Sequence, residues 1–376
     1  MSVSIMSSAR TRILFLTHKQ KVCGVHEFGI SVAEALNKSA RYAVIYAECS
    51  DPQELLAVVA RERPEAIICN YYSTTLPWLK RDLLQKLTIP SLGIMHEVSQ
   101  VAADSADTSL FDYHIAPDPT LVTNNPIVFK TGRVIPEYTN EFSPPKVLTI
   151  GSLGVASHEK GFERIIIAVQ EEFDEAIIRL HVPPGDFIDY DVKEAVQKFQ
   201  KLIIKPGIKL VTTHEFLERR QMLDFLAQNT LNAFFYERCE GRGISSTIEM
   251  ALAVRRPIAI TRSMMFRHVL SIDPKPDEPP ICIEAHNTMS WLQEFTLRLK
   301  RQKYLRFGAS KFPAQWLLKP SLSLREIIDN GVAPLERFHS MWTEANLISD
   351  YERILDCVLN QRSHRLQTVA SVAIGS

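Results

Sequence analysis

The chain has 376 residues, of which 45% are hydrophobic, and its 43 lysine and arginine residues balance 43 aspartate and glutamate residues. This length exceeds one ordinary hydrophobic core, so we expect about two domains in a globular, soluble protein. The balanced charge creates no overall field that would favour nucleic acid or an acidic membrane surface. No apolar stretch reaches the roughly 18 residues that span a bilayer.

The cysteines indicate a reduced environment. Six cysteines are scattered along the chain without a C-x-x-C pair, so we expect neither a disulfide framework nor a cysteine metal site. Residues 1–12 are short and serine-rich and lack the apolar segment of a signal peptide. These features predict a cytoplasmic protein.

Strand-like and helical patterns alternate along the first part of the chain. Short β-branched runs predict strands at 12–17, 42–48, 66–70, 91–96 and 113–116. Helical spacing predicts helices at 27–36, 52–61 and 79–87. Continuous apolar strands separated by helices are typical of a parallel sheet that is covered on both faces. We therefore predict one doubly wound domain.

A polar, proline-rich segment at 136–145 indicates an interdomain linker, after which the alternation resumes. We expect strands at 147–153, 176–182, 208–212, 231–236 and 257–261, and helices at 159–171, 192–203, 215–228 and 245–254. A strand at 281–284 and a helix at 288–301 extend this series. From about Leu324 the pattern is helical, and 361–376 lacks a clear pattern, so we expect it to fray.

These elements predict an α/β protein with two doubly wound, Rossmann-like domains. We place the first domain at 1–140, the second at 141–335, and a helical segment at 336–376 that packs back on the first domain. Two such domains facing each other leave a cleft at the carboxyl ends of their strands, where doubly wound sheets bind ligands.

The most informative segment is an acidic, glycine-containing loop that runs from Glu237 to the helix carrying Glu249. An apolar strand precedes the loop and a second strand follows the helix. A helix start offers unpaired backbone N–H groups to an anion, and neighbouring carboxylates can bind hydroxyls. A ligand with both phosphate and sugar hydroxyls suits this junction, which describes a nucleotide-sugar.

The run Glu240-Gly-Arg242-Gly243-Ile-Ser-Ser246-Thr-Ile-Glu249, followed by Arg256-Pro-Ile-Ala-Ile-Thr, resembles the signature of the retaining GT-B glycosyltransferases of family four. The resemblance implies that Glu249 binds the nucleotide ribose and that Glu240 lies at the donor sugar or reacting centre. It also implies donor contacts from Arg242, Gly243 and Ser246. The two glutamates are one residue further apart here than in the family.

A second match covers Ile150-Gly-Ser152-Leu153 and Glu159-Lys160-Gly161. The family has Gly-Arg-Leu followed by Lys-Gly, and its Arg and Lys neutralise the donor diphosphate. By this resemblance Lys160 binds the diphosphate, whereas Ser152 stands where the family has arginine. Arg164, Arg242 or Arg267 can supply the missing cation. Preplaced cations lower the barrier to departure of a nucleoside diphosphate without a metal ion.

Two further matches lie in the first domain. The segment Cys23-Gly24-Val-His26-Glu-Phe-Gly29 resembles the family's glycine loop, in which Gly24 would let backbone approach the phosphates and the acceptor. His96, at a strand end, stands where the family has a histidine that touches the donor sugar. Acceptor recognition would fall in loops such as 70–75 and 98–110.

Each of these residues also has an ordinary structural explanation. Glu240 and Glu249 can be acids near a helix start, which stabilise the helix dipole, with Glu249 at a solvent-facing position. Lys160 can be a solvated side chain, and His96 a half-buried histidine with its hydrogen bonds satisfied. Arg267 and His268 can line the cleft or cap a turn.

The resemblance implies the GT-B fold and a hexosyltransferase-type enzyme that moves a sugar from a nucleotide-sugar to an unknown acceptor. We expect the sugar to be transferred with retention of configuration and without a metal ion or cofactor. We expect no nucleic-acid partner, and peripheral contact with a membrane is an option. A catalytically degenerate GT-B protein that binds nucleotide, glycan or a protein partner is the alternative. An epimerase or phosphorylase on the same fold also stays open.

Overall fold

The structure is a computed structural model that describes residues 10–21, 23–122, 124–155, 157–184, 191–237, 242–272 and 322–374, with side chains up to residue 362. The chain forms two compact units, of which the first combines residues 1–137 with 338–376 and the second comprises residues 138–337. Each unit contains one parallel sheet, so the prediction of an α/β protein with two doubly wound domains is confirmed.

The first unit has a six-stranded sheet in the order β2-β1-β3-β4-β5-β6. Its strands are β1 (Thr11–Thr17), β2 (Tyr42–Glu48), β3 (Ala66–Cys69), β4 (Ser91–Ile94), β5 (Tyr113–Ala116) and β6 (Val128–Lys130). The helices are α1 (Gly24–Leu36), α2 (Pro52–Glu62), α3 (Arg81–Lys86), α4 (Gln100–Asp104) and α14 (Glu344–Ile374). All strand pairs in this sheet are parallel.

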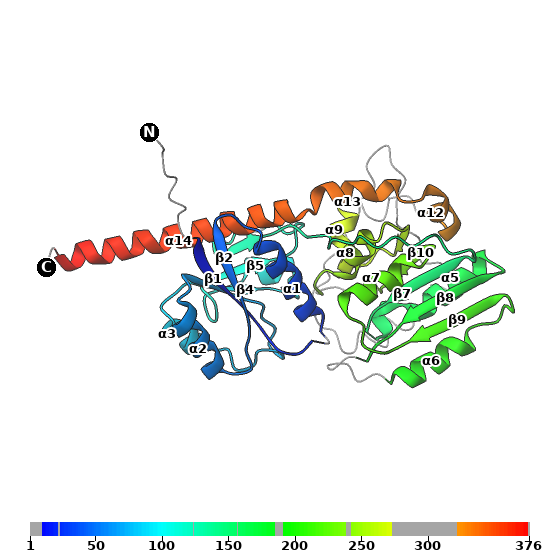
Figure 1. Cartoon of the computed structure of the whole chain (residues 1–376), viewed down its shortest axis with the longest axis horizontal. Coiled ribbons are helices and arrows are strands. Elements are labelled where there is room, and N and C mark those ends of the chain that lie inside the picture. The colour runs from blue at the N-terminus through cyan, green and yellow to red at the C-terminus, as the bar shows by residue number, and fades with distance from the viewer. Residues whose placement is uncertain are drawn as a thin grey trace. The chain divides into compact units, whose positions relative to one another are not determined.

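The alternation of side chains along β1 explains why helices cover both faces of this sheet. Ile13 and Phe15 belong to a core with residues of α1 and α14. Leu14 and Leu16 point to the other face and belong to a core with Leu55 of α2 and Leu84 of α3. Figure 1 shows α2 and α3 in blue on the side of the sheet opposite α14 in red.

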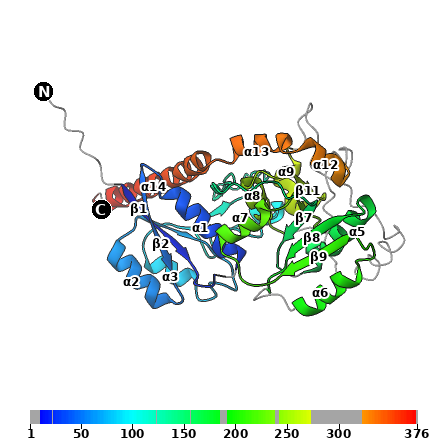
Figure 2. The same cartoon turned by 45° about the vertical axis from the view of Figure 1, so that its right-hand side comes forward.

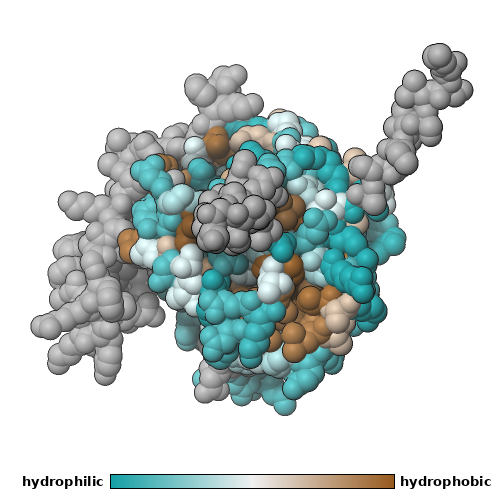
Figure 3. Space-filling model, turned by 90° about the vertical axis from the view of Figure 1, so that its left-hand side faces the viewer, coloured by the Kyte–Doolittle hydropathy of each residue, from teal (hydrophilic) through white to brown (hydrophobic). Residues whose placement is uncertain are grey.

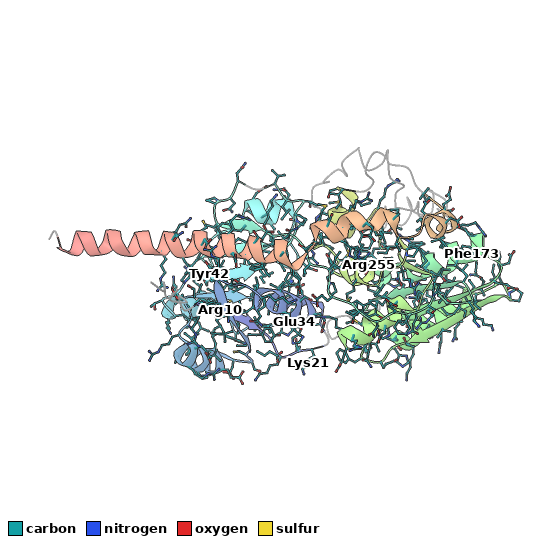
Figure 4. The ribbon with its side chains drawn as sticks, turned by 45° about the horizontal axis from the view of Figure 1, so that its top comes forward. Arg10, Lys21, Glu34, Tyr42, Phe173 and Arg255 are labelled. Carbon is teal, nitrogen blue, oxygen red and sulfur yellow. The ribbon has the colours of Figure 1, made fainter. Side chains whose placement is uncertain are left out.

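The helix α14 completes the first unit although it comes from the end of the chain. Its residues Leu347, Tyr351, Ile354, Leu355 and Val358 recur at helical spacing and are buried in the core with β1 and α1. The hydroxyl of Tyr42 on β2, labelled in Figure 4, donates to Asp356 Oδ1 on α14 at 2.5 Å.

The second unit has a five-stranded sheet in the order β11-β10-β7-β8-β9. Its strands are β7 (Thr149–Leu153), β8 (Ala176–His181), β9 (Ile208–Thr213), β10 (Leu231–Phe234) and β11 (Ile258–Ile260). The helices are α5 (Phe162–Glu172), α6 (Val192–Lys201), α7 (Arg219–Ala227), α8 (Thr247–Ala253), α9 (Arg267–Leu270), α12 (Leu324–Asn330) and α13 (Glu336–Met341). The boundary between the units falls within α13, whose residues from Phe338 onward belong to the first unit. The 3₁₀ turns are η1 (His158–Lys160), η2 (Met264–Phe266) and η3 (Ala333–Leu335).

Helices again flank the sheet of the second unit, as Figure 2 shows for α5 and α6 beside β8 and β9. Phe162 of α5 and Phe199 of α6 pack with their ring centroids 5.8 Å apart in the core beneath this sheet. Ile327 of α12 joins the same core. The helices α5, α6 and α12 therefore share one core with the strands of this sheet.

The segment predicted as a linker has no helix or strand, and it is fixed to the second unit by side-chain hydrogen bonds. The Tyr138 hydroxyl and the Asn140 amide both donate to Asp224 Oδ1 on α7, at 2.6 and 2.8 Å. Arg220 donates to Asn140 Oδ1 at 2.9 Å. These bonds hold the segment to α7 through the Asp224 carboxylate and the Arg220 guanidinium.

Several elements differ from the sequence expectations. The short strand β6 and helix α4 were not predicted, because three to five residues give too little periodicity to detect. The expected fraying after residue 361 is wrong for the backbone, since α14 continues to Ile374. Residues 361–374 contain no Gly or Pro that would end a helix, and the next residue in the sequence is Gly375. The strand and helix expected at 281–301 lie outside the described residues.

None of the described helices is long and apolar enough to cross a membrane. Hydrophilic residues cover most of the described surface on the face shown in Figure 3, with hydrophobic residues in smaller areas between them.

Tyr351 allows a direct test of how α14 contributes to stability. The side chain is fully buried, and its hydroxyl has no hydrogen-bond partner among the described residues. Tyr351→Ala should lower the free energy of unfolding by about 3–5 kcal/mol, because it leaves a large cavity. Tyr351→Phe should leave that free energy unchanged or raise it, because it removes a buried polar atom without a partner.

Urea denaturation of the two variants checks this prediction. A Tyr351→Phe protein that is destabilised by more than about 1 kcal/mol would show that the hydroxyl makes a favourable interaction.

Candidate functional site

The order of strands in the second unit identifies where a ligand is expected. From β7 the chain proceeds to β8 and β9 on one side, and it then returns to place β10 and β11 on the other side. The neighbouring strands β7 and β10 therefore form the topological switch point, outside which doubly wound sheets bind ligands. The segments that follow these two strands carry Lys160 and Glu249.

The turn after β7 is attached closely to the segment after β10. The N–H of Glu237 donates to the carbonyl of Glu159 at 2.8 Å. Gly161 has φ +63°, and a Cβ atom at this position would lie 2.0 Å from the carbonyl oxygen of Phe235. Only glycine fits both the left-handed backbone and this close approach. The glycine of the Lys160-Gly161 pair is therefore a packing requirement at the switch point.

This attachment places the Lys160 ammonium on an aromatic ring. Lys160 Nζ lies 4.0 Å from the ring centroid of Tyr236, which is a cation–π geometry. Burial acts to raise the pKa of the Tyr236 phenol, but the Lys160 charge and hydrogen bonding with Lys160, Thr247 and Ser245 outweigh burial, so this pKa lies below its ordinary value. The side chain of Lys160 is therefore held and is not simply solvated.

Four other charged side chains surround Lys160 as two pairs. Arg242 lies 3.4 Å from Glu159 and Arg164 lies 3.3 Å from Glu237. Because each arginine faces a glutamate, the two pairs add little net charge. Among the described residues, no carboxylate lies within ion-pair distance of Lys160, so it supplies the net positive charge of this group.

Glu249 lies on α8 and is buried, with 4% of its surface exposed. Its Oε1 lies 3.6 Å from Nε2 of His268, which is on α9 and is also buried. The alternative that Glu249 is a solvent-facing helix residue is therefore wrong. The sequence indicated His268 only as half of a cation pair with Arg267, because α8 and α9 come together only in the fold.

The start of α8 differs from the predicted helix 245–254. The helix begins at Thr247, and Ser246 is its N-cap without a side-chain capping bond. The Ser245 hydroxyl donates to Thr247 Oγ1 at 3.2 Å, and the Tyr236 hydroxyl reaches the same oxygen at 3.4 Å. Hydroxyl groups therefore gather where the segment after β10 meets α8.

The remaining predicted donor residues have different surroundings. Gly243 is buried, and Arg242 is exposed. Arg267 is buried and donates to the carbonyls of Arg242 and Met264 at 3.0 and 2.9 Å, so it holds backbone in place. Ser152 is fully buried in β7, and its hydroxyl carries no positive charge. Glu240 lies outside the described residues.

In the first unit, polar side chains follow β1, β3 and β4 at their carboxyl ends. His96 Nε2 lies 2.8 Å from Asn70 Oδ1. The Asn70 amide in turn donates to Thr17 Oγ1 and to the carbonyl of Val25, at 2.9 and 2.7 Å. Since the Asn70 carbonyl must accept, His96 is the tautomer that carries its proton on Nε2.

The surroundings of His96 keep the imidazole neutral. Burial, the Arg133 guanidinium and His18 together lower the pKa of His96 to about 3. The Phe28 ring packs edge-on against the imidazole, with centroids 5.2 Å apart. His96 and Asn70 lie at the switch point of this unit, because β1 and β3 are neighbours from which the chain proceeds in opposite directions.

The segment predicted as a glycine loop is the start of a helix instead. Gly24 is the first residue of α1, and a Cβ atom there would contact nothing within 4 Å. Gly29 is the glycine that packing requires, since its Cβ would lie 2.3 Å from the Asn70 amide nitrogen. The open space at Gly24 agrees with room for a ligand, but no described neighbour demands a glycine there.

A histidine pair beside α1 was not predicted as a unit. His26 Nε2 lies 3.0 Å from Glu48 Oε1, and the rings of His26 and His18 have centroids 5.7 Å apart. Burial and the neighbouring His26 lower the pKa of His18 to about 4, although Glu48 opposes this change. The two histidines come from either side of the β1–α1 turn, and only the fold brings in Glu48 from β2.

No group of three or more His, Cys, Asp or Glu residues within the described ranges is arranged to hold a metal ion.

Comparison by sequence gives no assignment, since no family model matches the chain and no curated protein matches it. Comparison by structure gives strong similarities. Anabaena HepE in complex with UDP and glucose superposes with a TM-score of 0.58 at 13% identity, over 93% of this chain and 100% of that chain.

Two other solved structures cover a similar extent. A glycosyltransferase from Rickettsia africae has a TM-score of 0.58 at 9% identity, over 93% of this chain and 99% of that chain. Sucrose-phosphate synthase from Thermosynechococcus elongatus has a TM-score of 0.54 at 11% identity, over 96% of this chain and 100% of that chain. The chain therefore has the GT-B glycosyltransferase fold.

Proposed function

We propose that the protein is a glycosyltransferase that moves a sugar from a nucleotide-sugar donor to an acceptor, with retention of configuration and without a metal ion or cofactor. The observation that carries this proposal is the charge arrangement at the β7–β10 switch point, where Lys160 is the cation without a carboxylate partner among the described residues. HepE, which shares the fold, is in complex with UDP-glucose in a second solved structure.

In this proposal the second unit binds the donor. Lys160 contacts the diphosphate and stabilises the negative charge that develops as the nucleoside diphosphate leaves. Glu249 accepts hydrogen bonds from the ribose hydroxyls. Arg242, Gly243 and Ser246 lie on the segment that leads into α8, the helix that carries Glu249. Glu240 contacts the donor sugar.

The first unit contributes His96 and Gly24. His96 contacts the sugar as a neutral imidazole, which agrees with its lowered pKa. Gly24 leaves room at the start of α1 for phosphate or acceptor. The acceptor is a glycan, lipid or small molecule. We assign no general base, since the departing phosphate can accept the acceptor's proton.

A second candidate function is a GT-B protein that binds a nucleotide, glycan or protein partner without transfer. The buried Ser152 favours it, because the strand offers serine where the resemblance implies arginine. Nucleotide binding followed by a transfer assay separates the two functions.

The proposed function makes three predictions, of which the first concerns nucleotide binding. UDP, GDP, ADP, CMP and dTDP are compared by thermal shift, and one diphosphate should stabilise the protein selectively. At about 100 times the dissociation constant, the stabilisation is about 2.7 kcal/mol, which raises the melting temperature by several degrees. Lys160→Met should weaken binding about tenfold or more, because a charge-assisted hydrogen bond is lost.

Lys201→Met is the matched control, since it removes the same charge from an exposed position at the end of α6. Glu249→Gln should reduce the shift by the nucleotide and leave the shift by inorganic pyrophosphate unchanged. If no diphosphate stabilises the wild-type protein, the donor-site proposal fails.

Metal independence is the second prediction. Since Lys160 supplies the positive charge at the leaving group, transfer should proceed at an unchanged rate in excess EDTA. A rate that collapses with EDTA and returns with Mg²⁺ would contradict the proposal.

The third prediction concerns pH. Because the pKa of His96 is lowered to about 3, the imidazole stays neutral from pH 5 upward, and its titration should cause no fall in kcat/KM between pH 8 and pH 5. His96→Gln should reduce kcat while leaving the shape of the pH profile unchanged. An acidic limb with an apparent pKa between 5 and 7 that disappears in this variant would contradict the neutral role.

A further inference from the structure

We propose that Tyr236 is a positioning residue that holds the Lys160 ammonium at the donor diphosphate without neutralising it. The inference rests on the proposed function, because it concerns how the same site presents its cation. The observation behind it is the position of Lys160 Nζ, 4.0 Å from the Tyr236 ring centroid.

The ring is fixed from several sides. Tyr236 is the second residue after β10 and has 1% of its surface exposed. The Phe266 ring packs against it with centroids 4.7 Å apart, and its hydroxyl reaches Thr247 Oγ1 at 3.4 Å. A ring held in this way provides a rigid surface on which a flexible lysine can be oriented.

The stem of Lys160 is also constrained. A Cβ atom at Gly154 would lie 3.4 Å from Cδ of Lys160, so the stem passes over the backbone that leaves β7. The close approach of Gly161 to Phe235 fixes the backbone on the other side of Lys160. The ammonium is therefore directed over the ring of the residue that follows Phe235.

The choice of an aromatic partner has a chemical consequence. A carboxylate partner would orient Lys160 but would cancel the charge that the diphosphate needs. The face of an aromatic ring attracts the ammonium through its quadrupole and carries no net charge. The two nearby glutamates, Glu159 and Glu237, are each paired with an arginine. Lys160 thus keeps its full charge while it stays ordered.

The experiment measures by calorimetry the binding of the nucleoside diphosphate that the thermal-shift comparison selects, and of its monophosphate, written below for uridine as UDP and UMP. The variants are Tyr236→Phe, Tyr236→Leu, Lys160→Met and the Tyr236→Leu/Lys160→Met double variant. Tyr236→Phe keeps the ring, and its affinity for UDP should stay within about twofold of wild type. Tyr236→Leu should bind UDP about fivefold to tenfold more weakly, with a smaller change for UMP. The double variant should bind UDP no more weakly than Lys160→Met alone, because Tyr236 acts through Lys160.

A second measurement does not depend on whether Tyr236→Leu folds. Incorporation of 3,4,5-trifluorophenylalanine at position 236 keeps the shape of phenylalanine and weakens the negative face of the ring. This protein should bind UDP more weakly than Tyr236→Phe, and the difference should disappear when Lys160 is replaced by methionine.

Three results would overturn the inference while the wild-type protein still binds UDP. They are additive losses in the double variant, equal losses for UDP and UMP in Tyr236→Leu, and equal affinity of the fluorinated and Tyr236→Phe proteins. Failure of the wild-type protein to bind any nucleoside diphosphate would instead overturn the proposed function.

Discussion

The arrangement of the second unit depends on the contact between Gly161 and the carbonyl oxygen of Phe235. Because a Cβ atom would lie 2.0 Å from that oxygen, only glycine allows the turn after β7 to lie against the segment after β10. The contact joins two segments that are about 75 residues apart in the chain. It also sets the position of Lys160 above Tyr236 and brings Glu159 and Glu237 to their arginines. As a consequence, the Lys160 ammonium, the Tyr236 ring and the hydroxyls of Ser245 and Thr247 lie at the same edge of the sheet.

The two units use the same kind of sheet edge with different electrostatics. At the switch point of the second unit, paired charges surround one lysine whose charge is not compensated by a described carboxylate. At the switch point of the first unit, histidines and an asparagine form hydrogen bonds, and the pKa values of His18 and His96 are lowered. A cationic edge suits a diphosphate, whereas a neutral edge with fixed donors suits hydroxyl groups.

A shared fold does not establish a shared reaction, and identities of 9–13% to the solved structures show the fold alone. The buried Ser152 shows how this chain can differ inside a common architecture. A serine side chain carries no positive charge, so in the proposed function the charge at the leaving group comes from Lys160, which lies over the Tyr236 ring. The function therefore depends on the site's chemistry and is open to direct measurement.

The sequence by itself determined the two parallel sheets, because strands buried on both faces produce continuous apolar runs between helical patterns. Short motifs that resemble the family's signature also singled out Lys160, Gly161 and Glu249 as candidates, because each motif is contiguous in the chain. Only the tertiary structure decided that Glu249 is buried beside His268, that Gly29 lies against Asn70, and that Tyr236 supports Lys160. The physical reason is that these contacts join segments distant in the chain, and periodicity carries no information about which strand edges become neighbours.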